Sequence, residues 1–427
     1  PRDHGRLEAN EVLVLRTPAT ATMSRMKSYF EVLRQPGVGR LVASQLCARF
    51  PAGMLSLAIL MHIEQSYGNY SAAGLIMAAM GVGQAISGPL SSRLMARFGM
   101  RLVVGVTILS CSLGLAGLAL FTDILWVSAA LAAFIGLAMP PITPAVRTIY
   151  PKVVPAIFLS KLFSVDATLQ ELIWVIGPLV ATTTASHFST MWGVLLCSII
   201  MFLGGTWFWT APEVGLVRIP RSKYPLGAVL ANPVVLIMTI LGLFMTGVFA
   251  GIETAVVATF GHDRAETGII IGLSAVGSIV GGFAFGHRPV TPLALVMRCV
   301  PFIIGAAMCC LWHETWWLAV AFILTGVGCA PLISGSFAAV SSSVRFSQTA
   351  ESYGWMGTGQ LVGGAASSAI AGVAIDAIGP QGGYLTGLGF AIASLLLILV
   401  TWGFIPDLRG RDATPHPDTE PIGIIVS

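Results

Sequence analysis

The chain has 427 residues, of which 55% are hydrophobic and only 10% are Asp, Glu, Lys or Arg, and its formal net charge is +4. A soluble globular domain carries about 25% charged residues, so this composition excludes a soluble fold and predicts a protein embedded in a lipid bilayer. Uncharged apolar runs, such as residues 102–121 and 384–404, have the roughly 20 residues that a helix needs to cross about 30 Å of hydrocarbon.

In chain order, a polar tail (residues 1–35) precedes twelve apolar segments, each predicted to be a membrane-spanning helix. The longest and most polar connection, residues 211–231, divides them into two groups of six, residues 36–210 and 232–405, and a second polar tail covers residues 406–427. The predicted fold is therefore an all-α integral membrane protein with two six-helix bundles. The predicted spans are 40–62, 71–92, 101–121, 124–146, 160–185, 190–210, 232–259, 267–286, 291–311, 315–339, 350–375 and 382–405.

The positions of the basic residues predict how these helices are oriented, because cytoplasmic loops are enriched in Lys and Arg. If both termini are cytoplasmic, the loops on the opposite side contain a single basic residue, Arg264, together with acidic residues such as Asp123 and Glu314. We therefore expect cytoplasmic tails, a cytoplasmic linker and insertion in the cytoplasmic (inner) membrane. The loops on the predicted cytoplasmic side contain Arg93, Arg97, Arg101, Arg147, Lys152, Lys161, Arg218, Arg221, Lys223, Arg288 and Arg345.

The two halves of the chain also resemble each other. Tyr70-Ser-Ala-Ala-Gly-Leu-Ile aligns with Arg264-Ala-Glu-Thr-Gly-Ile-Ile, so that Gly74 corresponds to Gly268, and further on Pro141, Thr168 and Gln170 correspond to Pro331, Thr358 and Gln360. A repeat of six spans in the same direction predicts two bundles related by pseudo-symmetry, with a substrate path between them. Chance similarity between apolar helices is the alternative.

One loop carries a recognisable motif. The segment Gly88-Pro-Leu-Ser-Ser-Arg-Leu-Met-Ala-Arg-Phe-Gly-Met-Arg101 resembles the signature between the second and third helices of the major facilitator superfamily. Arg97, Gly99 and Arg101 fit this signature, but Ala96 stands where the family has an Asp that takes part in a cytoplasmic gate. The resemblance implies a twelve-helix transporter, and we expect Glu351 to supply the missing carboxylate by meeting Arg97 or Arg101.

Two further family signatures match only in part. The family often has an Arg inside the fourth helix, whereas the sequence places Arg147 at the cytoplasmic end of that helix. The glycine ladder of the fifth helix in antiporters survives as Gly177-Pro178, and the run from Thr168 to Pro178 is similar to that of bacterial efflux members. This similarity favours export over uptake.

Ionisable residues inside the hydrocarbon are the strongest indication of a site, because each costs several kcal/mol unless it is paired or hydrated. Glu171 and Arg49 lie roughly 16 Å and 14 Å from the cytoplasmic ends of the fifth and first helices, so we expect a buried pair that is either structural or coupled to proton or substrate binding. Asp166 is about 140° around the helix from Glu171 and about 9 Å deep. It is predicted to pair with residues nearer the cytoplasm.

The remaining candidates have two interpretations each. Glu253 either lines the outer mouth of the cavity or lies at the membrane interface. Arg298 either reaches toward the cytoplasm or belongs to a site, and Glu351 either caps its helix or closes the gate. Amides and aromatic residues at membrane depth either contact an amphipathic substrate or bond and anchor helices. These residues are Gln45, Gln84, Gln170, Gln360, Trp174, Tyr353 and Trp355. Separately, prolines predict kinks in the first, fourth and tenth helices; they are Pro51, Pro140, Pro141, Pro144 and Pro331.

The sequence has no GxxxxGK[ST] phosphate loop, no nucleophile elbow and no HExxH motif, and its seven cysteines lie in apolar runs. ATP-driven pumping and catalysis are therefore disfavoured, and no metal or other cofactor and no nucleic-acid partner is predicted. We expect a monomeric secondary transporter in the lipid bilayer that exports a small molecule in exchange for protons. The alternatives are metabolite uptake by symport or facilitation, a non-transporting receptor and an intramembrane enzyme.

Overall fold

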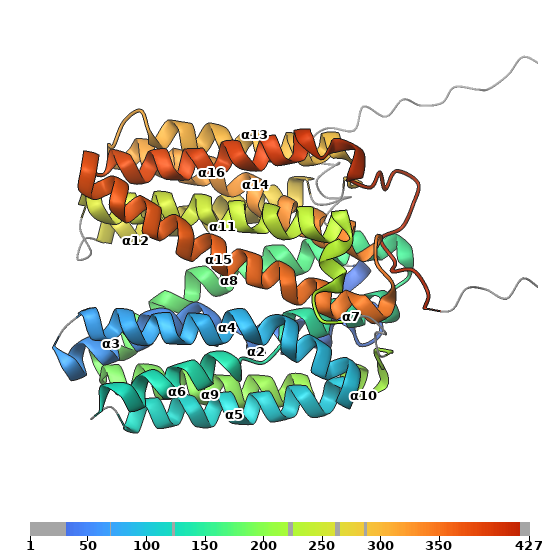
Figure 1. Ribbon diagram of the computed structural model, residues 1–427, viewed down its shortest axis with the longest axis horizontal. Helices are drawn as coiled ribbons and strands as arrows, with labels where there is room; N and C mark the ends of the chain where they lie inside the picture. Colours follow the sequence, from blue (N-terminus) through green and yellow to red (C-terminus); the bar gives the residue numbers. More distant parts are fainter. Residues whose placement is uncertain are drawn as a thin grey trace, which may run out of the picture.

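The computed structural model describes residues 31–68, 70–121, 124–220, 225–260, 265–285 and 288–418. Within them, twelve helical segments are long and apolar enough to cross a membrane, which confirms the predicted spans. They form two bundles that lie side by side (Figure 1). The first contains α2 (Val38–Arg49) with α3 (Pro51–Tyr67), α4 (Tyr70–Phe98), α5 (Met100–Leu120), α6 (Leu125–Leu137) with α7 (Ile142–Val153), α8 (Ala156–His187) and α9 (Thr190–Trp209).

The second bundle repeats this arrangement. It contains α11 (Pro233–Phe260), α12 (Ala265–Phe285), α13 (Pro292–Cys309), α14 (Thr315–Ser341), α15 (Phe346–Ile378) and α16 (Gln381–Val400). The connection between the bundles includes the short helices α10 (Pro212–Leu216) and η1 (Ala228–Ala231), and η2 (Trp402–Phe404) follows α16. The predicted twelve-helix, two-bundle fold is confirmed. The tail 1–35 lies mostly outside the described residues, as do linker positions 221–224.

Prolines break the first and fourth spans, as predicted. The first span divides at Phe50 into α2 and α3, with Pro51 at the start of α3, and the fourth divides between α6 and α7 at Pro140 and Pro141. Proline has no N–H to bond the carbonyl one turn earlier, so the helix ends and restarts at these positions. In contrast, α14 continues through Pro331. The two breaks matter for the site because Arg49 precedes the first one and Arg147 follows the second.

Small residues let the helices within a bundle approach closely. A Cβ atom added to Gly277 or Gly281 of α12 would lie 1.9 Å from a backbone oxygen of α14, and one added to Gly326 of α14 would lie 1.9 Å from a backbone oxygen of α12. No side chain fits at these distances. Small residues allow this close packing. In lipid, helix association has no hydrophobic driving force and depends on van der Waals contacts between closely packed helices.

The two bundles meet along α4 and α15. Backbone atoms of Gly88 and Gly354 are in contact, because a Cβ at Gly354 would lie 2.5 Å from the Gly88 oxygen. One residue further along α4, Pro89 leaves the carbonyl of Ala85 without its helical N–H partner. The hydroxyl of Thr358 donates a hydrogen bond to this carbonyl at 2.9 Å, so the proline prepares an acceptor for the opposite bundle.

A second contact between the bundles joins α8 to α12 and is the pseudo-symmetric counterpart of the first. In the internal repeat, Gly88 corresponds to Gly282 and Thr358 to Thr168. Ser164 donates to the backbone oxygen of Gly282 at 3.1 Å, and the Thr168 side chain packs on the same glycine. The repeat read from the sequence thus forms both sides of the interface between the bundles.

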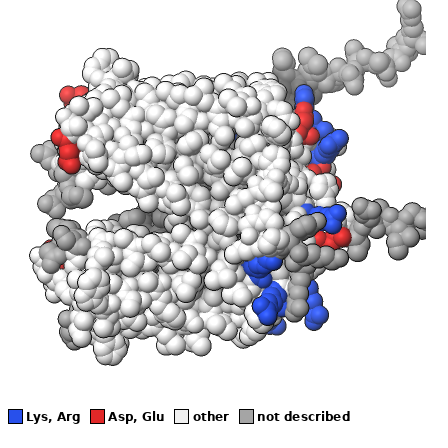
Figure 2. All heavy atoms as spheres, viewed as in Figure 1, with Lys and Arg blue, Asp and Glu red and all other residues white. Residues whose placement is uncertain are grey.

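Both contacts lie in the helix halves nearest one end of the molecule, and the other halves diverge. Figure 2 shows Lys and Arg side chains gathered at the closed end and a hollow between the bundles at the opposite end. The segment after α16 also folds back over the closed end, where His416 pairs with backbone groups of Val344 and Phe346 and Leu408 N bonds Val290 O at 2.8 Å. The structure is therefore closed on its basic side and open on the other.

Candidate functional site

A cavity of about 350 Å³ lies between the two bundles, near the lower end of the range of small-molecule sites, about 300–1,000 Å³. Its wall is mostly apolar, with amide and hydroxyl groups distributed along both bundles. Gln170 of α8 and its repeat counterpart Gln360 of α15 both line it. The other polar or aromatic lining residues include Arg49, Ser56, Gln84, Ser87, Ser91, Thr143, Arg147, Trp174, Phe337, Tyr353 and Thr358.

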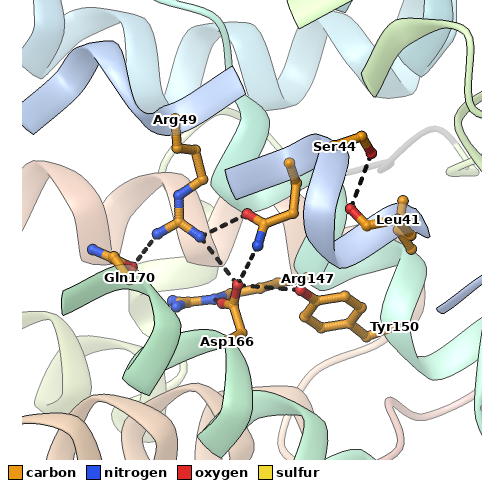
Figure 3. Close-up of polar contacts among 8 residues, drawn as sticks. Leu41, Ser44, Arg49, Arg147, Tyr150, Asp166 and Gln170 are labelled. Atoms are coloured by element: carbon orange, nitrogen blue, oxygen red, sulfur yellow. Dashed lines mark hydrogen bonds and ion pairs between the residues drawn. The ribbon is translucent and has the colours of Figure 1, made fainter. Parts of the chain in front are cut away.

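A buried ionic cluster lies on the side of the cavity formed by the first bundle. Asp166 of α8 is fully buried and accepts from two arginines, Arg147 Nε at 2.7 Å and Arg49 Nη1 at 3.1 Å. Figure 3 shows Arg49, Arg147 and Tyr150 directed toward Asp166. We call Arg49, Arg147 and Asp166 the arginine–aspartate cluster. It joins the first, fourth and fifth spans.

Uncharged groups complete the hydrogen bonds of this cluster. Gln45 Nε2 and Tyr150 Oη donate to Asp166 Oδ1 at 3.0 and 3.2 Å. Gln45 Oε1 accepts from Arg49 at 2.9 Å, and Gln170 also accepts from Arg49. Buried charges are tolerated when they are paired and hydrogen-bonded in this way.

The cluster also reaches the second bundle. The guanidinium carbon of Arg147 lies 3.6 Å from the ring centroid of Phe337 on α14, which is a cation–π contact. Phe337 packs in turn on Tyr353 of α15, with ring centroids 5.2 Å apart. The charge in the first bundle therefore contacts α14 of the second bundle directly and α15 through Phe337.

The predicted pair between Arg49 and Glu171 is wrong, because Arg49 pairs with Asp166. The pair was predicted because Arg49 and Glu171 lie at similar depths along their helices, but depth does not show which face of α8 packs on α2. The two carboxylates lie on different faces of α8, as their spacing indicated, and it is the Asp166 face that packs on α2. Glu171 instead faces the second bundle, where Cys329 Sγ lies 3.8 Å from Glu171 Oε1 and the Ser278 hydroxyl is nearby. Among the described residues it has no cationic partner.

Arg147 does not lie in a cytoplasmic loop as predicted. It is 2% exposed and sits inside the fourth span, which extends to Val153. The predicted span ended at residue 146 because the charged Arg147 interrupts the apolar run. In the structure, Asp166 compensates this charge, so the helix continues through it. Its neighbours Val146 and Ile149 are fully buried, and this apolar pattern around the arginine was the signal for a buried position. Tyr150 was missed for the same reason.

The other candidates divide between the cavity wall and the protein interior. Trp174 and Tyr353 line the cavity together with Gln84, Gln170 and Gln360, whereas Gln45 lies behind the wall. Trp355 packs near Gly227 instead.

Two more charged candidates lie outside the cavity wall. Glu253 is a half-buried residue of α11 for which no described residue provides a hydrogen bond or ion pair. Arg298 bonds the backbone oxygens of Pro331 and Arg288, each at 2.9 Å.

The predicted gate carboxylate also contacts an arginine. Glu351 Oε2 lies 3.5 Å from Arg93 Nη1, and Glu351 Oε1 accepts from the backbone N–H of Gly227 at 2.7 Å. Arg101 lies over the ring of Trp209, and Arg97 shares a surface pocket with Glu351. Gly99 fits the loop because its φ is 93°, a value that favours glycine. Glu351 thus joins α15 to α4 and to the linker at the closed end, with Arg93 as its partner.

This ion pair should stabilise the closed basic side. Because Arg93 is partly exposed, we expect Glu351→Gln to weaken closure by about 1 kcal/mol, or about fivefold in the conformational equilibrium. Labelling of a cysteine at position 360 by a membrane-impermeant maleimide, in a background without the seven native cysteines, should become slower. Glu351→Arg should slow it further, and Arg93→Glu with Glu351→Arg should restore it. A double variant that labels no faster than Glu351→Arg would contradict a direct pair.

Comparisons with known proteins agree with this architecture. The family model described as Major Facilitator Superfamily matches residues 41–288 and 258–424, and a comparison with curated proteins gives no match. A bacterial homologue of the iron transporter ferroportin in an outward-facing state has a TM-score of 0.70 at 13% identity over 86% of this chain and 98% of its own. The human organic anion transporter MFSD10 (TETRAN) gives 0.67 at 15% over 86% and 99%.

A third structure, the proton:xylose symporter XylE bound to 6-bromo-6-deoxy-D-glucose, has a TM-score of 0.65 at 14% identity over 92% of this chain and 98% of its own. At such identities, the three structures support the fold alone.

Proposed function

This chain belongs to the major facilitator superfamily, whose members are secondary transporters and not enzymes, and we propose that it exports a small molecule in exchange for protons. The observation that carries the proposal is the cavity between the bundles, which is closed at the basic end and open at the other. A site reached from one side at a time is what alternating access requires.

The orientation is part of this proposal. The closed end carries the Lys and Arg side chains in Figure 2, and the positive-inside rule assigns such an end to the cytoplasm. The cavity then opens outward, both termini are cytoplasmic, and the chain resides in the cytoplasmic membrane as a monomer. On this basis, residues 36–210 and 232–405 are the two moving units and residues 211–231 are a cytoplasmic linker. The positions 221 and 264, whose basic residues contributed to the prediction, lie outside the described residues.

Glu171 is the proposed proton site. It is buried where α8 meets α12 and α14, and a buried carboxylate without a cation is far less costly when it is protonated. Separation of the bundles at the cytoplasmic end would expose it to water, where it can release the proton. Asp166, the second carboxylate of α8, is held by two arginines in one bundle and is therefore less suited to exchange protons during the cycle.

The direction of transport rests on the similarity of the run from Thr168 to Pro178 to efflux members. Uptake by symport or facilitation is the alternative, because the same cavity and carboxylate can serve either direction. The experiment is flux into proteoliposomes of compounds first selected by thermal stabilisation of the purified protein, with a pH-sensitive dye trapped inside. Protons and compound should move in opposite directions. Movement in the same direction would contradict exchange, and the absence of any flux would contradict transport.

Membrane vesicles prepared from cells test the orientation. Arg288 and Glu314 are exposed and lie before and after α13 (Pro292–Cys309), so the proposed topology assigns them to opposite sides of the membrane. In right-side-out vesicles, an impermeant maleimide should label a cysteine introduced at position 314 and leave one at position 288 unlabelled. The reverse pattern would contradict the proposed orientation.

A further inference from the structure

The charge on the cavity wall is unbalanced. Among its described lining residues, the charged ones are Arg49 and Arg147, and no Asp, Glu or Lys contributes. The nearest compensating charge is Asp166, which is fully buried behind the wall. Two guanidinium groups against one carboxylate leave one net positive charge next to a mostly apolar cavity, where it is poorly screened.

The hydrogen bonds show which part of the cluster is available to a ligand. Asp166 engages Arg147 through Nε alone. The terminal nitrogens Nη1 and Nη2 of Arg147 donate no hydrogen bond to a described residue and lie by the ring of Phe337 on the cavity wall. A guanidinium fork of this kind matches the two oxygens of a carboxylate, sulfonate or phosphonate.

We propose that the cargo is an amphipathic organic anion whose acidic group binds the terminal nitrogens of Arg147, with Arg49 contributing its charge. The apolar part of the anion lies against Ile173, Trp174 and Leu361, which line the same cavity. This inference rests on the proposed transport function, since it names the class of molecule that is moved. A cation of the same shape is repelled by the net charge, and a neutral molecule leaves that charge without a partner.

The first test compares matched ligands. Phenylacetate, 2-phenylethylammonium and 2-phenylethanol share an apolar body and differ in charge, and their naphthyl analogues extend the series. Binding to the purified full-length protein is measured by ligand-dependent thermal stabilisation. We expect saturable stabilisation by the anions and none by the cations or alcohols. Equal or tighter binding of a cation or alcohol, or no anion with a Kd below about 1 mM, would overturn the proposal.

Variants of the cluster provide the second test. Arg147→Gln removes the net charge and should weaken anion binding about ten- to hundredfold, the range expected for a hydrogen bond to a charged group. Arg147→Gln combined with Asp166→Asn restores one net positive charge through Arg49 and should regain part of the affinity. A purely structural role of Arg147 predicts no such recovery. If Arg147→Gln does not give a monodisperse protein, Arg147→Lys keeps the charge without the fork and should bind anions with intermediate affinity.

Arg298 supplies the matched control. It is also a buried arginine, but it bonds backbone oxygens in the second bundle and does not line the cavity. Arg298→Gln should leave anion affinity within about twofold of the wild type, because the substituted side chain does not line the cavity. Equal loss in Arg298→Gln and Arg147→Gln would overturn the assignment. Anion binding without flux would contradict the transport function alone, and flux of a cation without anion binding would contradict this inference alone.

Discussion

Replacing Asp166 with Asn should destabilise the protein by about 3–5 kcal/mol, because removal of one partner leaves buried charges uncompensated. Arg49 and Arg147 would both remain, 8% and 2% exposed, without the carboxylate that they share. The first, fourth and fifth spans would lose their common contact. Thermal unfolding in detergent and the fraction of monodisperse protein measure the effect, and we expect a lower midpoint and a small yield.

Two further variants separate charge from general damage. Asp376 is an exposed carboxylate at the end of α15, so Asp376→Asn should change stability by no more than about 0.5 kcal/mol. Adding Arg147→Gln to Asp166→Asn removes one of the two uncompensated cations and should raise the midpoint again. If Asp166→Asn unfolds at the wild-type temperature, the ion pairs do not hold these spans together.

The fold was predictable because spans are a local property of the sequence. Length and hydropathy determine whether a helix can cross the bilayer, and both can be read without knowing any neighbour. The internal repeat added the division into two bundles, and it also related the contact at Gly88 to the one at Gly282. The breaks at Pro51 and Pro141 followed from the missing N–H of proline.

The pairings within the site could not be predicted in the same way. Helix position gave the depths of Arg49, Asp166 and Glu171, and the spacing showed that the two carboxylates lie on different faces of α8. Which face of α8 contacts α2 depends on how the helices pack together, and the sequence of α8 alone does not determine it. Arg147 was misplaced because hydropathy treats each charge as unpaired, whereas its partner Asp166 lies on the next helix.

The gate illustrates the intermediate case. The missing acid at Ala96 indicated that another carboxylate was needed, and the adjacency of α4 and α15 indicated Glu351. The arginine that it meets is Arg93, one helical turn before Arg97. The motif therefore predicted that a carboxylate would pair with an arginine of this loop region, but it did not predict which arginine along α4 would be the partner.

Glu171 is expected to couple proton movement to transport. In Glu171→Gln, transport driven by a pH gradient should fall to the level of protein-free liposomes, while exchange of substrate without a gradient should survive. Glutamine keeps the shape and the contact with Cys329 but binds no proton, so the carrier still alternates and no longer exchanges a proton for cargo. External protons drive the proposed export. Raising the external pH should therefore slow gradient-driven transport by the wild type and leave substrate exchange by the variant unaffected.

Glu253 provides the control for this experiment. It is another carboxylate in a membrane-spanning helix, and the described residues offer it no partner, but it lies in α11 and does not take part in the contact of α8 with Cys329. Glu253→Gln should therefore retain gradient-driven transport and its pH dependence. If Glu171→Gln still accumulates substrate against its gradient at the wild-type rate, Glu171 is a structural residue of the contact between α8 and α14. Loss of exchange as well as accumulation would point to the same conclusion, because a proton site can be neutralised without stopping the movement of the bundles.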